Sequence, residues 1–298
     1  MNYDEEFLTP NLKDINVLLT GGNQGLGATL AKELVKSQAN LIICARTKSS
    51  IDLVKKNLDL LKHKNQKLYG VVTDISNSKD VEDLYNKAKS ELGNIDILIN
   101  NAAVIEPPNK FLECDFTEWK KSFDINFFGS VLMIKKFLPD MVKNGFGKVI
   151  QLSGGGATSP LEGMTSYASS KVAIVRFLES ISKEYLDSGV DFNSVAPGMM
   201  RTRLLQQMVD AGPDVIGPAL HDKSKDLVNS ASDSSVLACK LILFLCSERS
   251  RGISGKLISA QWDNWQTWPE HIRELVNSDV FTLRRITGKD RNFHWGDL

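Results

Sequence analysis

Tyr167 and Lys171 are the residues of this chain whose types and spacing could most directly move a proton. Residues four positions apart on a helix lie on one face, so the phenol and the ammonium can point into the same pocket. A phenol has an ordinary pKa of about 10, and a fixed cation beside it favours the phenolate and lowers that pKa. The pair predicts an acid/base centre, although an exposed Tyr and a solvated Lys would show the same spacing.

A glycine-rich loop precedes this pair, since Thr20–Gly27 has the sequence Thr-Gly-Gly-Asn-Gln-Gly-Leu-Gly. Glycines between a first strand and a first helix let backbone N–H groups approach a pyrophosphate at the helix N-terminus. The spacing Gly-x-x-x-Gly-x-Gly departs from Gly-x-Gly-x-x-Gly, and the loop lacks the Gly-Lys-Ser/Thr of ATP- and GTP-hydrolysing P-loops. We expect a dinucleotide site here rather than an ordinary turn.

Short apolar runs alternate with helical patterns along the chain, as in a parallel sheet covered by helices on both faces. The expected strands are 15–20, 41–45, 68–73, 95–100, 148–153, 191–195 and 255–259. The expected helices lie near 25–38, 49–62, 78–91, 117–143, 166–187 and 233–247. The fold class is therefore α/β, a doubly wound sandwich with a seven-stranded parallel sheet whose strands end at one ligand-binding edge.

The composition is that of an ordinary soluble domain, since the 298 residues are 42% hydrophobic and 24% charged. Lys plus Arg and Asp plus Glu both number 36, so neither a nucleic-acid nor a membrane partner is expected. The N-terminus lacks a signal-peptide layout, and the longest dense apolar stretch, Leu241–Cys246, is too short to span a bilayer. The 4 cysteines have no metal-ligand spacing, so we expect a cytoplasmic protein with no metal site.

Several motifs occur together in the order and spacing of the classical short-chain dehydrogenase/reductases. They are Thr20–Gly27, Asn100-Asn101-Ala102-Ala103, Asn126, Tyr167 with Lys171, and Pro197-Gly198. The chain resembles this family over residues 12–260. The resemblance implies one Rossmann-type domain over residues 1–260, and a homodimer or homotetramer that pairs the helices near 117–143 and 166–187.

The resemblance also implies a cofactor site. Its expected residues are Gly21, Asn23, Gln24, Gly25, Leu26, Gly27, Arg46, Asp74, Ile75, Asn101, Ala102, Tyr167, Lys171, Pro197, Gly198 and Thr202. Among them, the glycines would line the pyrophosphate and Thr202 would lie near the nicotinamide carboxamide. Asn100 would support the pocket from the fourth strand. Asp74 would contact the adenine, unless it instead caps the helix that begins near Ser78.

The catalytic residues implied by the resemblance are Tyr167, Lys171, Asn126 and a serine. Lys171 would contact the nicotinamide ribose, and Asn126 would hold a water in a proton relay, unless it only satisfies a helix backbone. The family's serine position is occupied by Gly154, and Ser153 lies one residue earlier. Either Ser153 reaches the substrate oxygen, a backbone N–H of the glycine run polarises it, or Ser153 simply ends a strand.

The end of the second strand bears on the choice of cofactor. NAD-binding sites place a carboxylate there, whereas this chain has Ala45 followed by Arg46, with Lys48 two positions beyond. A guanidinium suits the 2′-phosphate of NADP, and such a contact contributes about 1.5–3 kcal/mol. Gln24 stands where NADP enzymes of the family often have a second basic residue. We expect NADP(H) to be favoured over NAD(H), the alternative being that Arg46 is a solvated cation.

Two segments interrupt the alternation of strands and helices. Residues 199–230 are long enough to form a lid over the substrate, and residues 261–298 form an extension that we expect to pack on this domain or on a neighbouring subunit. Three tryptophans of the extension, Trp262, Trp265 and Trp268, predict core or interface anchors or a sugar-stacking platform. The extension is similar to that of reductases from bacterial polysaccharide and nucleotide-sugar gene clusters. Arg284 and Arg285 would pair with a neighbouring subunit or bind an anionic substrate.

The expected function is an NADP(H)-dependent oxidoreductase that interconverts a small-molecule carbonyl and a secondary alcohol by hydride transfer. Tyr167 would give or take the hydroxyl proton. Two alternatives stay open at this point. The chain could be an epimerase or dehydratase that uses its bound nucleotide without consuming it. It could also be an NADP-binding sensor or scaffold that lost turnover, for which Gly154 is the reason.

Overall fold

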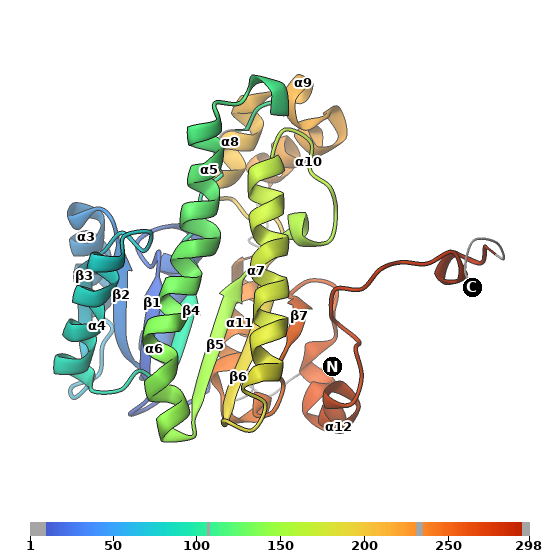
Figure 1. Ribbon diagram of the computed structural model, residues 1–298. Helices are drawn as coiled ribbons and strands as arrows, with labels where there is room; N and C mark the ends of the chain where they lie inside the picture. Colours follow the sequence, from blue (N-terminus) through green and yellow to red (C-terminus); the bar gives the residue numbers. More distant parts are fainter. Residues whose placement is uncertain (1–9, 106–107, 231–234, 294–298) are drawn as a thin grey trace.

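A computed structural model of the chain describes residues 10–105, 108–230 and 235–293. A seven-stranded sheet with the order β3-β2-β1-β4-β5-β6-β7 lies at its centre (Figure 1). Its strands are β1 (Asn16–Thr20), β2 (Asn40–Ala45), β3 (Leu68–Val72), β4 (Ile97–Asn100), β5 (Gly147–Leu152), β6 (Val190–Ala196) and β7 (Lys256–Ser259). Every neighbouring pair is parallel, so all the strands end at the same edge. The expected fold class is confirmed.

Helices cover both faces of the sheet. On one face lie α2 (Gly25–Lys36), α3 (Lys48–Asp59) and α11 (Ser235–Cys246), which share one hydrophobic core with the strands. On the other lie α4 (Ser78–Leu92), α6 (Ser130–Asn144) and α7 (Thr165–Glu184), which share a second (Figure 1). Neighbouring strand residues enter opposite cores, as Leu18 and Leu19 do, because successive side chains of a strand point to opposite faces.

The boundaries of the expected strands are right to within two residues, since most of the strands are short buried apolar runs, although β3 and β7 are only partly buried. The expected helix near 233–247 is observed as α11, and its first positions, 233 and 234, lie outside the described residues. Within the described part of the chain, no helix is both long enough and apolar enough to cross a membrane. The described cysteines are free, and three of the four are buried.

The expected helix over 117–143 is not one regular helix. It consists of α5 (Phe116–Phe123), a π-helical segment η2 (Asp124–Gly129) and α6. Gly129 closes the π segment, where an added Cβ would lie 2.8 Å from Ile75. Single π turns inside longer helices are frequently found at functional sites, and this one carries Asn126.

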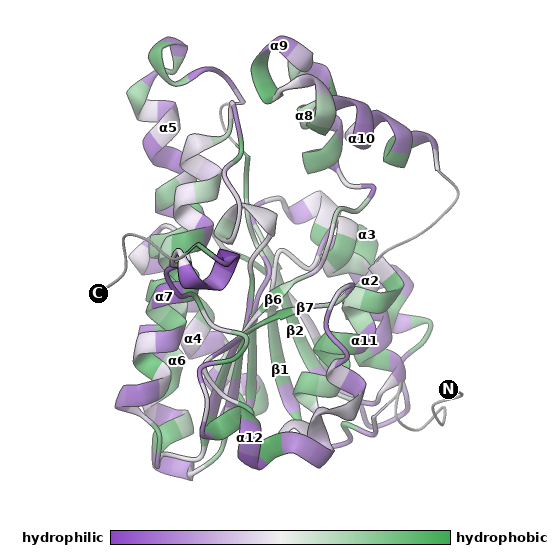
Figure 2. Ribbon diagram, turned by 90° about the vertical axis from the view of Figure 1, so that its right-hand side faces the viewer, coloured by the Kyte–Doolittle hydropathy of each residue, from purple (hydrophilic) through white to green (hydrophobic). Residues whose placement is uncertain are grey.

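Residues 199–230 contain three helices beyond the carboxyl ends of the strands. They are α8 (Arg203–Ala211), α9 (Pro213–Ile216) and α10 (Pro218–Asn229). Figure 2 shows them gathered at the opposite end of the molecule from α12 (Ile272–Val276). Short 3₁₀ turns complete the fold; they are η1 (Phe111–Glu113), η3 (Gly155–Ala157), η4 (Glu248–Ser250), η5 (Trp265–His271) and η6 (Lys289–Arg291).

The C-terminal extension packs on the domain from which it comes. Trp265 is fully buried against Phe244, with ring centroids 5.5 Å apart, and Trp268 joins the same core. Farther along, the backbone N–H of Leu257 in β7 donates to the carbonyl of Phe281 at 2.8 Å. The last described residues project away from the body of the molecule (Figure 1).

Candidate active site

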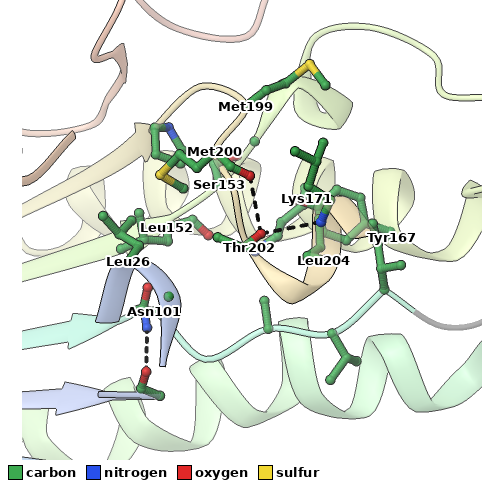
Figure 3. A pocket seen from close by; sticks show the side chains of 18 of the residues that line it. Leu26, Asn101, Leu152, Ser153, Tyr167, Lys171, Met199, Met200, Thr202 and Leu204 are labelled. Carbon is green, nitrogen blue, oxygen red and sulfur yellow. Dashed lines mark hydrogen bonds between the residues drawn. The ribbon is translucent and has the colours of Figure 1, made fainter. Parts of the chain in front are cut away.

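A cavity of about 1320 Å³ opens at the carboxyl ends of the strands. Every residue expected at the cofactor or catalytic site lines it except Asn100 and Asn126, which are both buried. Figure 3 shows Ser153, Tyr167 and Lys171 among the side chains that surround it. Ligands bind at this edge in doubly wound sheets. The sequence motifs, which are far apart in the chain, therefore meet in one place.

The glycine-rich loop forms a cradle between β1 and α2. Gly21 has a φ of +64°, and a Cβ on it would stand 2.9 Å from the Cα of Ala102. A Cβ on Gly27 would overlap the carbonyl oxygen of Gly21. Gln24 occupies the N-cap of α2 without a side-chain hydrogen bond to the first turn, so that turn directs its N–H groups toward the cavity. These residues fit the pyrophosphate of a dinucleotide.

Asn101 holds this cradle from the end of β4. Its side-chain amide donates to the carbonyls of Thr20 at 3.0 Å and Gly21 at 3.1 Å. We expected Asn100 to support the cofactor pocket from the fourth strand. In the structure, Asn101 makes the hydrogen bonds to the glycine-rich loop instead. Asn100 points to the opposite face, where its amide lies 3.5 Å from the carbonyl of Ser130. Adjacent residues at a strand end face opposite ways, and this explains the exchange.

Arg46 lies at the end of β2 on the rim of the cavity, exposed to solvent. Among the described residues none forms an ion pair with it, whereas Lys48 pairs with Asp52 at 2.7 Å. Asn23 fixes the neighbouring turn by donating to the Ser50 hydroxyl at 2.8 Å. Arg46 is therefore the cation of this segment that is available to a ligand.

Asp74 follows β3 and lines the cavity together with Ile75. Its carboxylate accepts from the backbone N–H of Ser76 at 2.9 Å and from the Ser76 hydroxyl. The alternative in which Asp74 caps α4 is wrong, because Asn77 is the N-cap and accepts from the N–H of Lys79 at 2.9 Å. Asp74 instead shapes the turn after β3 that borders the cavity.

Tyr167 and Lys171 lie on one face of α7, as expected. The Lys171 ammonium is buried 5.6 Å from the Tyr167 ring centroid and donates to the carbonyl of Leu152 at 2.9 Å. Burial lowers the pKa of Lys171 to about 8. Although part of Tyr167 reaches the cavity, desolvation of its phenol raises its pKa to about 12. The expected lowering of the Tyr167 pKa is therefore not seen, because desolvation of the phenol raises it.

Asn126 lies in the π segment and joins three parts of the chain. Its amide oxygen accepts from the backbone N–H of Val104 at 2.8 Å, and its amide nitrogen donates to the carbonyl of Val104 at 2.9 Å. The same nitrogen donates to the Ser170 hydroxyl at 3.1 Å, next to the Tyr167–Lys171 pair. Asn126 thus does more than satisfy its own helix, because it fixes the loop after β4 against α7.

Ser153 and Gly154 end β5 beside Tyr167. The Ser153 hydroxyl is buried and has no hydrogen-bond partner among the described residues. A Cβ on Gly154 would stand 2.7 Å from the phenol oxygen of Tyr167. A side chain at position 154 would therefore point toward the Tyr167 phenol. Ser153 belongs to the cavity wall, and no described residue uses the hydrogen-bonding capacity of its buried hydroxyl.

The turn after β6 brings Pro197, Gly198 and Thr202 to the cavity. Gly198 has a φ of +86°, and a Cβ on it would overlap the side chain of Gln261. Thr202 is the N-cap of α8, where its hydroxyl accepts from the N–H of Leu205 at 3.4 Å. Its methyl group would contact a Cβ on Gly25 at 3.3 Å, so the start of α8 lies against the start of α2.

The extension supplies wall residues, of which the sequence patterns had singled out only Trp262, as an anchor or part of a sugar-stacking platform. They are Gln261, Trp262, Asp263, Phe281 and Thr282. Of the three tryptophans, only Trp262 is exposed (83%), whereas Trp265 and Trp268 belong to the core. The spacing of the three tryptophans in the sequence could not tell the exposed residue from the two buried ones.

Arg284, which we expected to pair with a neighbouring subunit or to bind an anionic substrate, forms ion pairs within the chain. It pairs with Glu179 of α7 at 2.5 Å and with Asp279 of the extension at 3.0 Å, both within the chain. The guanidinium therefore anchors the extension to the domain.

The family model described as short chain dehydrogenase matches residues 15–212, which include the cradle, Asn126 and the Tyr167–Lys171 pair. The chain belongs to the short-chain dehydrogenase family. This confirms the resemblance and identifies the chain as an enzyme of an oxidoreductase family.

Relatives of this short-chain dehydrogenase carry oxidoreductase names. Oxidoreductase UcpA of Salmonella typhimurium is 31% identical over 259 residues, covering 86% of this chain and 95% of its own. Levodione reductase has a similar fold, with a TM-score of 0.75 at 23% identity over 86% of this chain and 98% of its own. L-sorbose reductase from Gluconobacter frateurii, complexed with NADPH and L-sorbose, has a TM-score of 0.74 at 20% identity over 84% and 96% of the two chains.

Proposed function

We propose that this protein interconverts a carbonyl compound and a secondary alcohol, using NADP(H) in preference to NAD(H). The observation that carries the proposal is the meeting, in one cavity, of the glycine cradle with the buried Tyr167–Lys171 pair. Bound NADPH supplies the hydride for reduction, and NADP⁺ accepts it in the reverse direction. The remaining chemistry is a proton transfer at the substrate oxygen, for which the chain has its own groups.

Tyr167 is the group that would give its proton to the substrate oxygen during reduction. A phenol of raised pKa stays protonated at neutral pH, so it is present as the acid. Lys171 would stabilise the phenolate that remains, since an ammonium beside it favours the charged form. With a pKa of about 8, Lys171 is mostly cationic at pH 7 and can also pass a proton on. The water relay through Asn126 remains part of this proposal.

The substrate oxygen would take a hydrogen bond from the Ser153 hydroxyl. Support comes from the burial of that hydroxyl and from its free hydrogen-bonding capacity. The competing donor is a backbone N–H of the glycine run that begins at Gly154. Donors fixed in a site that excludes water stabilise a developing negative charge better than water does.

Residues 199–230 would act as a lid that closes over the substrate and excludes water from the hydride path. The helices of this segment border the cavity through Leu204, Leu205 and Met208. We further propose a homodimer or homotetramer formed through the helices near 117–143 and 166–187, which are α5, η2, α6 and α7. Large apolar side chains are exposed there, with Phe116 at 71%, Phe128 at 50% and Val172 at 40%. A cytoplasmic location remains a proposal from composition.

The cofactor preference is tested by titrating NADPH and NADH separately into the purified protein and following tryptophan fluorescence or heat. We expect NADPH to bind about 10- to 100-fold more tightly, because Arg46 would contact the 2′-phosphate. Arg46→Ala should remove this preference, whereas Lys48→Ala, which removes a neighbouring cation that is already paired with Asp52, should keep it. Equal affinities in the wild-type protein would contradict the assignment of Arg46. Binding of neither nucleotide would contradict the proposed function.

A further inference from the structure

A third hydrophobic cluster, separate from the two cores of the sheet, surrounds the proposed acid. Its buried members are Ile105, Met164, Leu205, Met208 and Ile216. They come from the loop after β4, the segment before α7 and the helices α8 and α9. Tyr167 itself packs against this cluster. The reacting oxygen of a substrate at Tyr167 would therefore lie next to hydrocarbon.

The same cluster forms a wall of the cavity, which Ile105, Met164, Leu205 and Met208 all line. Methionine is unusually frequent here. Of the 7 methionines in the chain, Met164, Met199, Met200 and Met208 line the cavity. Unbranched, polarisable thioether side chains adapt to apolar partners of different shapes. The wall is suited to hydrocarbon groups and offers little to a dense set of hydroxyls.

Four charged side chains of the cavity follow strands β2, β3 and β6. Arg46 and Asp74 follow β2 and β3 at the adenosine end. Arg201 and Arg203 flank Thr202, whose methyl lies beside Gly25 on the side of the phosphate cradle.

Two charged groups remain on the substrate side of the cavity. The carboxylate of Asp263 accepts from the backbone N–H of Ser259 at 2.7 Å and serves the turn after β7. Lys223 is exposed on α10. A sugar nucleotide needs cations for its diphosphate in addition to those used by the cofactor, and of the two described charged groups on this side only Lys223 is a cation.

Two aromatic rings of the extension lie on the rim of the cavity. Trp262 is 83% exposed, and it follows Gln261, which lies against Gly198. Phe281 also lines the cavity and stacks on Trp268, with ring centroids 4.5 Å apart. An exposed tryptophan at the mouth of a cavity offers an apolar ligand contact area at low entropic cost.

We propose that the substrate is an apolar ketone, or the corresponding secondary alcohol, whose hydrocarbon part lies against this methionine-rich wall. In reduction, the carbon–oxygen π bond breaks while the carbonyl carbon gains the hydride of NADPH and the oxygen gains the proton of Tyr167. NADPH is oxidised to NADP⁺, and Tyr167 regains a proton from water. This inference rests on the proposed function and adds the substrate class to it.

The test uses straight-chain methyl ketones of increasing length, with ketoses of matched carbon number as the polar series. Consumption of NADPH gives kcat/KM for each compound. Calorimetry gives the affinity of the same compounds for NADPH-saturated Tyr167→Phe, which binds without turnover. We expect both quantities to rise about 2- to 4-fold per methylene in the ketone series, because each buried methylene adds up to about 0.8 kcal/mol. The ketoses should be poor substrates and weak ligands.

Variants then locate the effect. Met208→Gln keeps the length of the side chain but places an amide in the wall, so it should lower kcat/KM for long ketones at least tenfold while short ketones change little. Met199→Gln provides the same test at a second position if Met208→Gln does not fold. Leu60→Gln, which changes an 82% exposed leucine at the end of α3, is the matched control and should change nothing.

Each outcome separates the substrate class from the proposed function. Turnover and affinity that rise with chain length support both. Affinity that rises with chain length without any turnover by the wild-type protein supports the apolar site and overturns hydride transfer. A preference for ketoses in turnover and affinity overturns the apolar class and leaves the proposed function in place. Absence of both binding and turnover overturns both.

Discussion

The phenol oxygen of Tyr167 lies so close to the backbone of Gly154 that a Cβ at position 154 would stand 2.7 Å from it. The phenol can therefore lie at the end of β5 because residue 154 has no side chain. Where the family pattern has a serine, this chain uses the space for the tyrosine itself. The first prediction follows from that contact.

Gly154→Ser should impair the enzyme although it restores the family's residue. The new Cβ must displace the Tyr167 hydroxyl, and a displacement of about 1 Å costs on the order of 100-fold in rate. Steady-state kinetics should show the loss in kcat, with little change in thermal stability, because only the end of one side chain moves. Gly155→Ala is the matched control, since a Cβ there meets nothing within 4 Å. A faster Gly154→Ser enzyme would show that the serine arrangement is recovered.

Ser153→Ala separates the two proposed donors to the substrate oxygen. Removing one donor of this kind lowers kcat by about 10²–10³. Stability should stay the same or rise slightly, because the lost hydroxyl is buried and unpaired in the structure. Ser159→Ala removes an exposed hydroxyl from the same cavity and should leave kcat unchanged. An unchanged rate in Ser153→Ala would assign the role to the backbone N–H of the glycine run.

Lys171 should give the protein a stability that depends on pH. Burial lowers its pKa from 10.5 to about 8, so between these values the unfolded chain holds a proton that the folded chain has lost. The free energy of unfolding therefore rises with pH in this window, by at most about 1.4 kcal/mol per pH unit, and the contribution is lost as pH falls through 8.

The measurement compares urea unfolding of the wild-type protein with that of Lys171→Met across this window. The difference in unfolding free energy should shift in favour of the wild type as pH rises. Opposite slopes from the raised pKa values of Cys44 and Cys246 are common to both proteins and cancel. Points below pH 10 avoid the titration of Tyr167, which also lowers stability as pH rises from 10 to about 12. Lys64→Met removes an exposed cation as a control, and parallel curves for Lys171→Met would contradict the prediction.

Asn101→Ala should weaken cofactor binding through the shape of the cradle. The variant leaves the carbonyls of Thr20 and Gly21 without their amide partner, which costs about 1–3 kcal/mol for buried groups. NADPH affinity should fall roughly tenfold or more by calorimetry, and the thermal midpoint should fall with it. Asn109→Ala, which removes a partly buried amide outside the cavity, is the control. Unchanged affinity would mean that the glycine loop holds its shape alone.

Much of the fold could be predicted because the local and global signals agree. Each strand is a short apolar run that ends before a polar or glycine-containing turn, and buried parallel strands need such runs. The glycine-rich loop could be recognised in the sequence because its fold requires glycine. A Cβ on Gly27, for example, would overlap the carbonyl oxygen of Gly21. Tyr167 and Lys171 were recognisable because the helical repeat fixes their relation.

What could not be predicted depends on contacts between distant segments. The π turn at Asp124–Gly129 was not predicted from the helical pattern, and its Gly129 lies against Ile75, which follows β3 and is far away in the sequence. Asn100 and Asn101 exchanged roles because a shift of one residue reverses the direction of a side chain. The pKa of Tyr167 rises through burial, which the spacing to Lys171 does not encode. Trp262 joined the cavity only because the extension folds back on its own domain.

The hydrogen bond from Leu257 to Phe281 gives the extension a second role. β7 is the last strand of the sheet, and an open edge is a template on which a strand of another molecule can add. The segment that ends in Phe281 occupies that edge, and the Lys256 ammonium fastens it by donating to the carbonyls of Ser278 and Val280. Resistance to aggregation and the shape of the substrate site are thus encoded in one short stretch, so selection on one constrains the other.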